Sequence, residues 1–427
     1  MNLVVACNAC FGRWYVQIDM LVSKENVMSK LKFMKPFTQQ EPIPEQAKQK
    51  VMALLDSGRL HRYNTVGSEL SDAALLEQDF AQYQGRKYCL ACTSGGYGLH
   101  IALRAMGLQA GDQVLTNAYT LAPVPGAIHA AGGKPILVEI DNNYHLDLTD
   151  LEAKAKGSNA KILLLSLMRG HIPNMDQLMA LCNKLGLQVL EDCAHTMGGA
   201  WSGVKSGNFG QVAAFSLQTY KHMNTGEGGL VVTDDAEVAA RLIMHSGSYM
   251  LYERHGAAPA PEVFEKIRLT SANISGRMDN IRAVIGLAQL PGLDKNCERW
   301  NQRYNILHSS IALISGLDIP ARDKRESFVG SSLQFRATGL DAEQIPDFIA
   351  ACVAQGVKLK WFGAAQPNAF TSRYDSWHYI DPMPHLPNTL KALEKTLDLR
   401  VPLTFDDEDC YLIGAVIEQV MAEFIGQ

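Results

Sequence analysis

Two patterns of apolar and polar positions alternate along the chain after residue 36. Short apolar runs predict buried strands, and the stretches between them carry apolar residues three or four apart, which predicts helices. Regular alternation of the two is typical of a mainly parallel sheet with helices on both faces. The predicted strands cover residues 87–94, 112–117, 135–141, 161–167, 187–192, 212–217 and 228–235.

We expect two domains, because 427 residues exceed the size at which one hydrophobic core stops growing. Helical periodicity over residues 278–311 predicts a long helix that bends near Pro291, where the ring interrupts regular helix. We therefore place a large domain at residues 34–290 and a smaller α+β domain at 291–427. The smaller domain is predicted to contain a strand at 331–337 and helices at 342–356 and 407–425.

Residues 1–33 lack this periodicity, and they also lack the basic start and small-residue cleavage site of a secretory signal. We interpret them as an extension without a catalytic role. Met20, Met28 and Met34 each offer an alternative start.

The composition indicates a soluble globular protein, with 47% hydrophobic and 19% charged residues. A net charge of −5 gives no reason to expect binding to nucleic acid or to an anionic membrane, so we expect a cytoplasmic protein. The nine cysteines are scattered, which favours reduced thiols. Neither pair spaced as Cys-x-x-Cys, Cys7/Cys10 or Cys89/Cys92, has a second pair at the spacing of a zinc site.

Ligands of such sheets bind beyond the carboxyl ends of the strands, so the residues after each strand are the candidates for chemistry. Gly95, Gly96 and Tyr97 follow the first strand and open a helix, whose N-terminal N–H groups attract phosphate. Tyr119 follows the second strand, where its ring is placed to stack on a flat ligand or to pack in the core. By itself each feature is also explained by a tight turn or by ordinary packing.

Ionisable residues follow two later strands. Asp192 ends a buried strand, where a carboxylate needs a positive partner or serves as a helix cap, and His195 comes soon after. Ser216 and Gln218 precede Lys221, which is followed by His222. Pyridoxal 5'-phosphate (PLP) requires an amine, an anion cradle, a stacking surface and a carboxylate for its ring nitrogen. The set as a whole therefore favours a PLP enzyme.

The motifs resemble those of the DegT/DnrJ/StrS family of PLP-dependent sugar aminotransferases from about residue 36 to the C-terminus. The most specific match is S-x4-K-x4-G-E-G-G, which Ser216, Lys221 and residues 226–229 satisfy. Residues 191–195 match the family's E-D-x-A-[QH] element, and residues 277–290 also fit the family's sequence pattern. In the family the cofactor-binding lysine stands five residues after the serine and five residues before the Gly-Glu-Gly-Gly run. Lys221 meets both spacings and His222 meets neither.

The resemblance implies a fold type I enzyme, similar to aspartate aminotransferase, that works as a homodimer with shared active sites. It implies that Lys221 binds PLP and moves a proton, that Asp192 pairs with the ring nitrogen, and that His195 lies beside the ring hydroxyl. It further implies glutamate as amino donor and a keto- or aldehydo-sugar as acceptor. The residues implied to stack on the ring or to hold the phosphate are Tyr119, Gly95, Gly96, Tyr97, Ser216 and Gln218.

The chain departs from the family on the substrate side. Ser275 stands where the family has an asparagine that reaches the phosphate in the other subunit, and Asn273 lies two residues earlier. Residues 166–170 and 360–363 also differ from the usual family segments. Several cationic residues are candidates to bind an acidic sugar. The alternative is that each is a solvated surface charge. They are Arg169, His171, Lys360, His61 and Arg62.

Two other functions fit the sequence less well. A dehydratase of the same fold would bypass Lys221 and use His222 or His195 as the base. A PLP-binding regulator would require a DNA-binding helix-turn-helix, which residues 1–33 do not supply, and the acidic net charge also argues against it.

Overall fold

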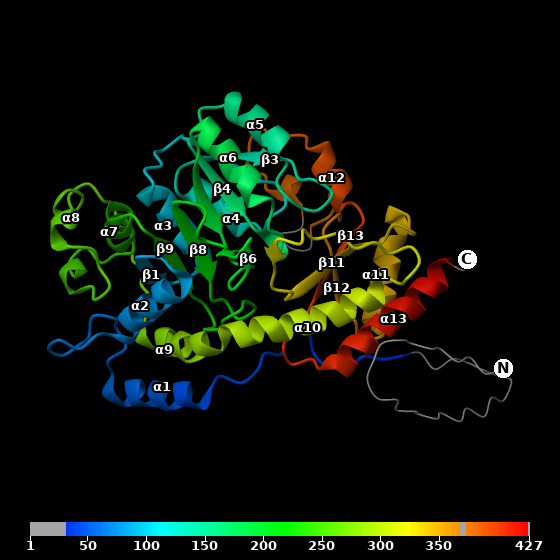
Figure 1. The fold of residues 1–427 in the computed structure, drawn as a ribbon, viewed down its shortest axis with the longest axis horizontal. Helices are drawn as coiled ribbons and strands as arrows, with labels where there is room; N and C mark the ends of the chain where they lie inside the picture. Colours follow the sequence, from blue (N-terminus) through cyan, green and yellow to red (C-terminus); the bar gives the residue numbers. More distant parts are fainter. Residues whose placement is uncertain (1–30, 368–372, 426–427) are drawn as a thin grey trace.

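The computed structural model describes residues 31–367 and 373–425. They form a large α/β unit and a smaller C-terminal unit, and the long helix α10 (Leu293–Ile311) runs along both (Figure 1). None of the helices in the described ranges is long and apolar enough to cross a membrane.

The large unit is built on a seven-stranded sheet of order β1-β9-β8-β5-β4-β2-β3. β9 alone runs antiparallel to its neighbours β1 and β8, and the other strands are parallel to one another. This confirms the predicted mainly parallel sheet. The strands are β1 (Tyr88–Cys92), β2 (Gln113–Asn117), β3 (Lys134–Val138), β4 (Ile162–Ser166), β5 (Gln188–Asp192), β8 (Val212–Ser216) and β9 (Gly229–Thr233).

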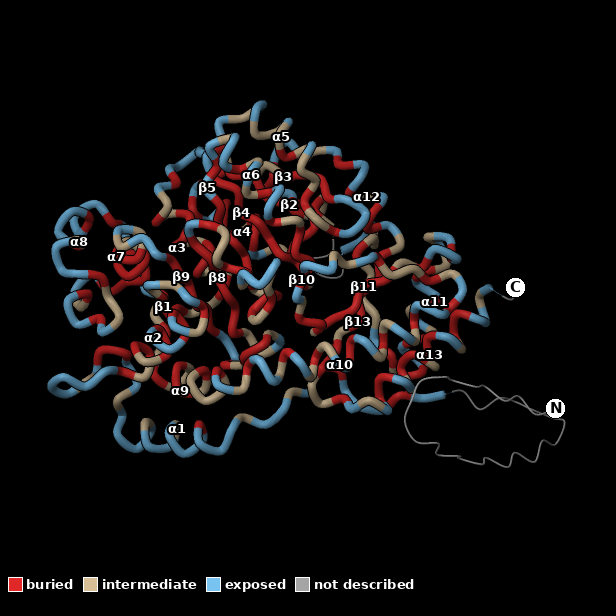
Figure 2. Tube along the Cα trace, in the orientation of Figure 1, coloured by how far each residue is buried: buried red, intermediate tan, exposed pale blue. Residues whose placement is uncertain are grey.

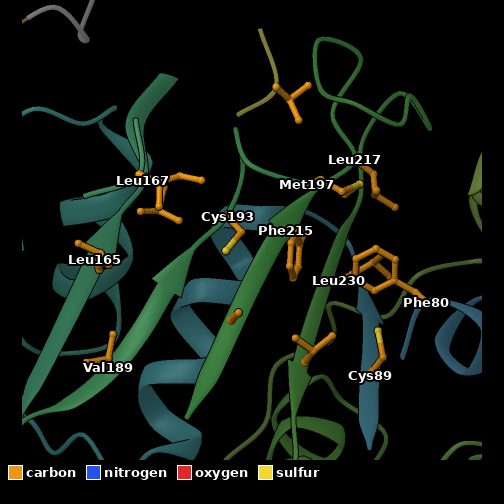
Figure 3. Close-up of a cluster of buried hydrophobic side chains, with 14 of the residues drawn as sticks. Phe80, Cys89, Leu165, Leu167, Val189, Cys193, Met197, Phe215, Leu217 and Leu230 are labelled. Carbon is orange, nitrogen blue, oxygen red and sulfur yellow. The ribbon is translucent and has the colours of Figure 1, made fainter. Parts of the chain in front are cut away.

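Helices cover both faces of this sheet, because alternate residues of each strand point to opposite sides. In β8, Val212 and Ala214 pack toward one face, whereas Ala213 and Phe215 pack toward the other. The cluster on the second face includes Phe80, Val189 and Leu230 (Figure 3). The helices of the large unit are α1 (Glu45–Ser57), α2 (Asp72–Gln84), α3 (Gly95–Ala105), α4 (Pro123–Ala130), α5 (Leu148–Lys156), α6 (Met175–Leu185), α7 (Ala236–His245), α8 (Pro261–Glu265) and α9 (Asn280–Gln289).

Local sequence sets where these helices begin and end. The side chain of Ser71 accepts a hydrogen bond from the Ala74 N–H and so caps α2, and Asn174 caps α6 through the Gln177 N–H. Gly85 ends α2 with φ 80°, in the left-handed region that favours glycine. The predicted bend at Pro291 is a short 3-10 turn, Leu290–Gly292, between α9 and α10.

The C-terminal unit is a three-stranded antiparallel sheet packed on helices. Its strands are β11 (Ser332–Arg336), β12 (Leu359–Trp361) and β13 (Thr396–Arg400), and its helices are α11 (Ile345–Ala354), α12 (Pro387–Leu393) and α13 (Asp407–Ile425). The prediction covered β11, α11 and α13 but not β12, α12 or β13. Short strands β6 (Ala200–Trp201), β7 (Val204–Lys205) and β10 (Glu326–Ser327) form a further small sheet.

The segment before α1 contacts the C-terminal unit. Phe33 and Phe37 pack with Phe405 in the core of the C-terminal unit, with ring centroids 5.0 Å from that of Phe405. Lys35 pairs with Asp406, Nζ to Oδ2 2.9 Å. Phe33 and Phe37 are therefore buried in the core of the C-terminal unit, whereas residues 34–36 between them are exposed, and the domain boundary near residue 34 stays a prediction. Figure 2 shows helix α1, which follows this segment, as mostly exposed.

The structure describes only one of the two Cys-x-x-Cys pairs. Cys7 and Cys10 lie outside the described residues. Cys89 and Cys92 are buried in β1, as the apolar run predicted, and burial raises the pKa of the Cys92 thiol to about 12.

Candidate active site

A cavity of about 400 Å³ lies at the carboxyl ends of the parallel strands. This volume falls within the range of ~300–1,000 Å³ that is usual for small-molecule sites. Because β9 is antiparallel, it begins at the edge where the parallel strands end. The segment just before it therefore reaches the cavity, through Glu227. The lining residues are Ser94, Gly95, Gly96, Leu99, Thr120, Leu121, Pro123, Val124, Ser166, Met168, Asp192, Ala194, His195, Ser216, Gln218, Lys221 and Glu227.

One end of the cavity is the N-terminus of α3. Ser94 caps this helix by accepting the Tyr97 N–H, which leaves Gly95 and Gly96 in its first turn beside the cavity. A Cβ on Gly95 would lie 2.8 Å from Cβ of Ser216, so glycine is needed where the turn after β1 meets the end of β8. Free N–H groups and the positive end of the helix dipole suit a phosphate at this point.

Asp192 lies at the end of β5 and faces the cavity. Its Oδ2 accepts a hydrogen bond from Ser166 Oγ at 2.9 Å, and its Oδ1 accepts the Ala194 N–H at 3.1 Å. Burial raises the pKa of this carboxyl above its ordinary value. A cationic ring nitrogen in the cavity would stabilise the ionised form.

Lys221 and His195 meet in the cavity, with Lys221 Nζ 2.7 Å from His195 Nε2. Burial, together with the charges of Arg169 and Arg400, lowers the pKa of Lys221 to about 7. Burial lowers the pKa of His195 well below its ordinary range, so the imidazole is neutral. The site therefore holds a lysine amine that is substantially unprotonated at neutral pH.

His222 points into the core behind Lys221. It packs edge-on against Trp300 with ring centroids 5.0 Å apart, its Nε2 lies 3.3 Å from Ser331 Oγ, and it does not line the cavity. Burial lowers the pKa of His222 to about 3. Adjacent residues in the sequence thus occupy two different environments.

Some predicted ligands do not reach the cavity. The Tyr119 ring packs against Tyr144 and Phe362, with centroids 5.5 Å and 5.1 Å away, and Thr120 and Leu121 line the cavity instead. Tyr119 therefore does not line the cavity, and its stacking on the cofactor stays a prediction.

Tyr97 is placed near the helix N-terminus, but its side chain turns away. Its hydroxyl donates to the carbonyl oxygen of His245 at 3.0 Å, so only its main chain remains near the cavity. Ser275 is exposed and does not line this cavity, and its predicted role toward another subunit stays a prediction.

Ser166, Met168 and Glu227 line the cavity, although the sequence analysis named them only as parts of the segments 166–170 and 226–229 and gave them no role of their own. Ser166 ends β4 as Asp192 ends β5, so the strand-end rule identifies it once the strands are predicted. Leu121 has no chemical signature, and only its position after β2 brings it to the cavity.

The cations proposed to meet an acidic sugar divide into two groups. Arg62 is buried in a two-pronged ion pair with Glu77, at 2.8 and 2.7 Å, and is not available to a substrate. Burial lowers the pKa of His171 well below its ordinary range, so it is neutral, and its Nε2 lies 2.7 Å from Gln334 Oε1. Arg169 remains near Lys221 and His195 and lowers the pKa of both, whereas Lys360 lowers the pKa of His195.

The cavity fits PLP. The cradle at Gly95 and Gly96 fits the phosphate, the buried Asp192 fits the ring nitrogen, and Lys221 supplies the unprotonated amine.

Known proteins resemble the chain over much of its length. A GDP-perosamine synthase of Caulobacter vibrioides is 34% identical over 222 residues, which are 52% of this chain and 57% of that protein. A pleiotropic regulatory protein of Geobacillus stearothermophilus is 30% identical over 263 residues, 61% of this chain and 64% of that protein. The matched segments thus span less than two thirds of both relatives.

The fold is also that of a solved structure, 3-amino-5-hydroxybenzoic acid synthase, with a TM-score of 0.77 at 23% identity over 92% of this chain and 100% of that one. The sequence profile of the DegT/DnrJ/EryC1/StrS aminotransferase family matches residues 41–418. With the lysine, aspartate and glycine cradle in one cavity, the chain belongs to this family of PLP-dependent aminotransferases.

Proposed function

We propose that the protein transfers an amino group from glutamate to a keto- or aldehydo-sugar, with PLP as cofactor. The observation that carries this proposal is the Lys221 amine, whose pKa lies near 7 and whose Nζ is 2.7 Å from His195 Nε2. An unprotonated lysine inside a phosphate-binding cavity is what covalent binding of an aldehyde and proton transfer both require.

Each residue contributes a defined part of the transfer. PLP, when bound, supplies an electron sink for the carbon that loses its proton. Lys221 Nζ would hold the cofactor and move the proton, Asp192 would keep the ring nitrogen protonated, and His195 would hold Nζ in place. Glutamate leaves as 2-oxoglutarate, and the carbonyl carbon of the sugar receives the nitrogen.

We further propose an acidic acceptor, 3-deoxy-manno-octulosonate oxidised at C8, which would become 8-amino-3,8-dideoxy-manno-octulosonate for lipopolysaccharide synthesis. The charge of Arg169, which acts on Lys221 and His195, and that of Lys360, which acts on His195, support an acceptor that carries a carboxylate.

The dehydratase alternative needs a histidine base. His222 is buried against Trp300 outside the cavity and cannot take this role, and His195 remains the base that such a reaction would require. Product analysis separates the two reactions, because transfer places nitrogen on the sugar whereas dehydration releases water. A protein that only regulates would bind PLP without turnover.

We also propose that the protein is a cytoplasmic homodimer. Large apolar side chains are exposed on the segment that precedes Ser275, including Met250 at 77%, Leu269 at 92% and Ile274 at 65%. Exposed apolar side chains gathered in one segment are typical of an interface. In the proposed dimer this segment meets a second copy and brings Ser275 toward the partner's site.

The absorbance spectrum of the bound cofactor tests the reaction. Wild type is expected to change from the pyridoxal to the pyridoxamine spectrum on addition of glutamate, and to return on addition of the acceptor. Lys221→Ala is expected to show neither change. Identical spectra for the two proteins would exclude Lys221 as the cofactor-binding residue.

A further inference from the structure

Three cations from different parts of the chain gather beyond the Lys221 side of the cavity. Arg169 follows Met168, which lines the cavity, and Lys360 and Arg400 come from β12 and β13 of the C-terminal unit. Arg169 Cζ and Lys360 Nζ lie 5.7 Å and 4.8 Å from the centroid of the same ring, that of Phe362. We call Arg169, Lys360 and Arg400 the cation cluster.

Arg400 connects this cluster to the reactive lysine. Its Cζ lies 3.6 Å from the ring centroid of Tyr220, the residue before Lys221. The charges of Arg169 and Arg400 both lower the pKa of Lys221, and that of Lys360 lowers the pKa of His195. The cluster therefore adjoins the atoms proposed to react.

The cluster holds more positive than negative charge. Asp398 is its one acidic neighbour among the described residues that forms an ion pair with it, and its Oδ2 lies 2.7 Å from Arg169. The other oxygen, Oδ1, accepts Gln334 Nε2 at 2.7 Å. Within residues 31–367 and 373–425, neither Lys360 nor Arg400 has an ion pair, so the excess is two positive charges.

Such an excess is unfavourable without an anion. Lys360 and Arg400 are both half-buried, and this burial lowers the pKa of Lys360 and lowers that of Arg400 to about 10. Arg169 also has φ 56° and ψ 22°, a left-handed conformation that is rare for non-glycine residues and is found at functional sites. Its Nε is buried without a hydrogen-bond partner.

We propose that Arg400 and Lys360, organised by Arg169, form a subsite that binds a substrate carboxylate beside Lys221. The planar guanidinium of Arg400 would bind the carboxylate through two hydrogen bonds, and Lys360 would supply a second charge. This inference rests on the proposed function for the identity of the substrates, and two of them carry carboxylates: glutamate and the acidic sugar.

Calorimetric binding to the holoenzyme tests the subsite, without turnover for the two sugar probes and with the first half-reaction for glutamate. The probes are 3-deoxy-manno-octulosonate, whose C8 hydroxyl cannot accept nitrogen, its methyl ester, and glutamate. Wild type is expected to bind the acid more tightly than the ester. Arg400→Met and Lys360→Met are each expected to weaken carboxylate binding by about tenfold or more, whereas Arg400→Lys retains part of the affinity.

Lys391→Met is the matched control, because Lys391 is an exposed cation on α12 and its loss changes the net charge equally. A loss with the sugar acid alone assigns the subsite to the acceptor, and a loss with glutamate alone assigns it to the donor. Either result supports the carboxylate subsite. Unchanged binding of both acids in folded Arg400→Met and Lys360→Met, or equal binding of acid and ester by wild type, would overturn it.

A second measurement distinguishes a direct role of Arg400 in the site from a role in holding the fold together. Because the Arg400 charge lowers the pKa of Lys221, Arg400→Met is expected to raise the pH midpoint for chemical modification of Lys221 in the apoprotein, and Lys391→Met is not. The glutamate-dependent change in the cofactor spectrum is measured on the same variants in the PLP-bound form. If that change is absent while the sugar acid binds through the cluster, the proposed function fails and the subsite stands.

Discussion

Neighbouring residues in this chain take opposite roles because one side chain points to the cavity and the next points to the core. Lys221 lies 2.7 Å from His195 at the cavity, and His222 packs on Trp300. We expect Lys221→Ala to lower kcat by roughly 10²–10⁴-fold, the usual value of a positioned proton-transfer group. His222→Gln should retain most of kcat, although its thermal stability falls.

These rates are measured with saturating glutamate and a fixed acceptor. His195→Gln is the companion variant, since it contacts Lys221 without replacing it. A loss of activity in His222→Gln as large as that in Lys221→Ala would refute the assignment.

The protonation state of Lys221 predicts a pH dependence. Only the unprotonated amine attacks the aldehyde of PLP, and the pKa of Lys221 is lowered to about 7. Capture of PLP by the apoprotein should therefore rise about tenfold between pH 6 and pH 8 and then level off. The rate is measured by reducing the adduct with borohydride and weighing the protein by mass spectrometry. A midpoint near the ordinary lysine value of 10.5 would contradict the buried environment.

At the scale of elements, the glycine run before β9 is required by packing. A Cβ on Gly229 would lie 2.4 Å from the carbonyl oxygen of Ser94, in the turn that opens the phosphate end of the cavity. Gly229→Ala must push this turn away from β9. We expect the free energy of unfolding to fall by roughly 1–3 kcal/mol and PLP binding to weaken.

Thermal unfolding and cofactor occupancy measure the two effects of Gly229→Ala. Gly292→Ala is the control, because Gly292 has φ −95° and nothing within 4 Å of the added Cβ. Equal stability of the two variants would show that the Ser94 turn moves without cost.

At the scale of the whole molecule, the exposed apolar side chains on residues 249–274 predict self-association. Sedimentation is expected to give twice the chain mass. Leu269→Glu combined with Ile274→Glu should shift the protein toward the monomer and reduce activity. Leu313→Glu is the control, since Leu313 is 88% exposed in the C-terminal unit. A wild-type protein that sediments as a monomer would exclude the shared-site dimer.

The sequence by itself determined the elements and the main reactive residues. Apolar periodicity predicted all seven strands of the large sheet and the bend at Pro291, because both patterns follow from local geometry. Asp192 ends one predicted strand and Lys221 follows another, and both line the cavity because the carboxyl ends of the parallel neighbours β5 and β8 lie at the same edge of the sheet.

Only the tertiary structure decided which residues meet across long distances. Tyr119 follows the expected strand, yet the Phe362 ring from the C-terminal unit packs against it and Leu121 takes the place at the cavity. Arg62 proved to be neutralised by Glu77, and Arg400 joined Arg169 near Lys221. These outcomes depend on contacts between segments far apart in the sequence, and such contacts are set by packing and charge pairing rather than by local periodicity.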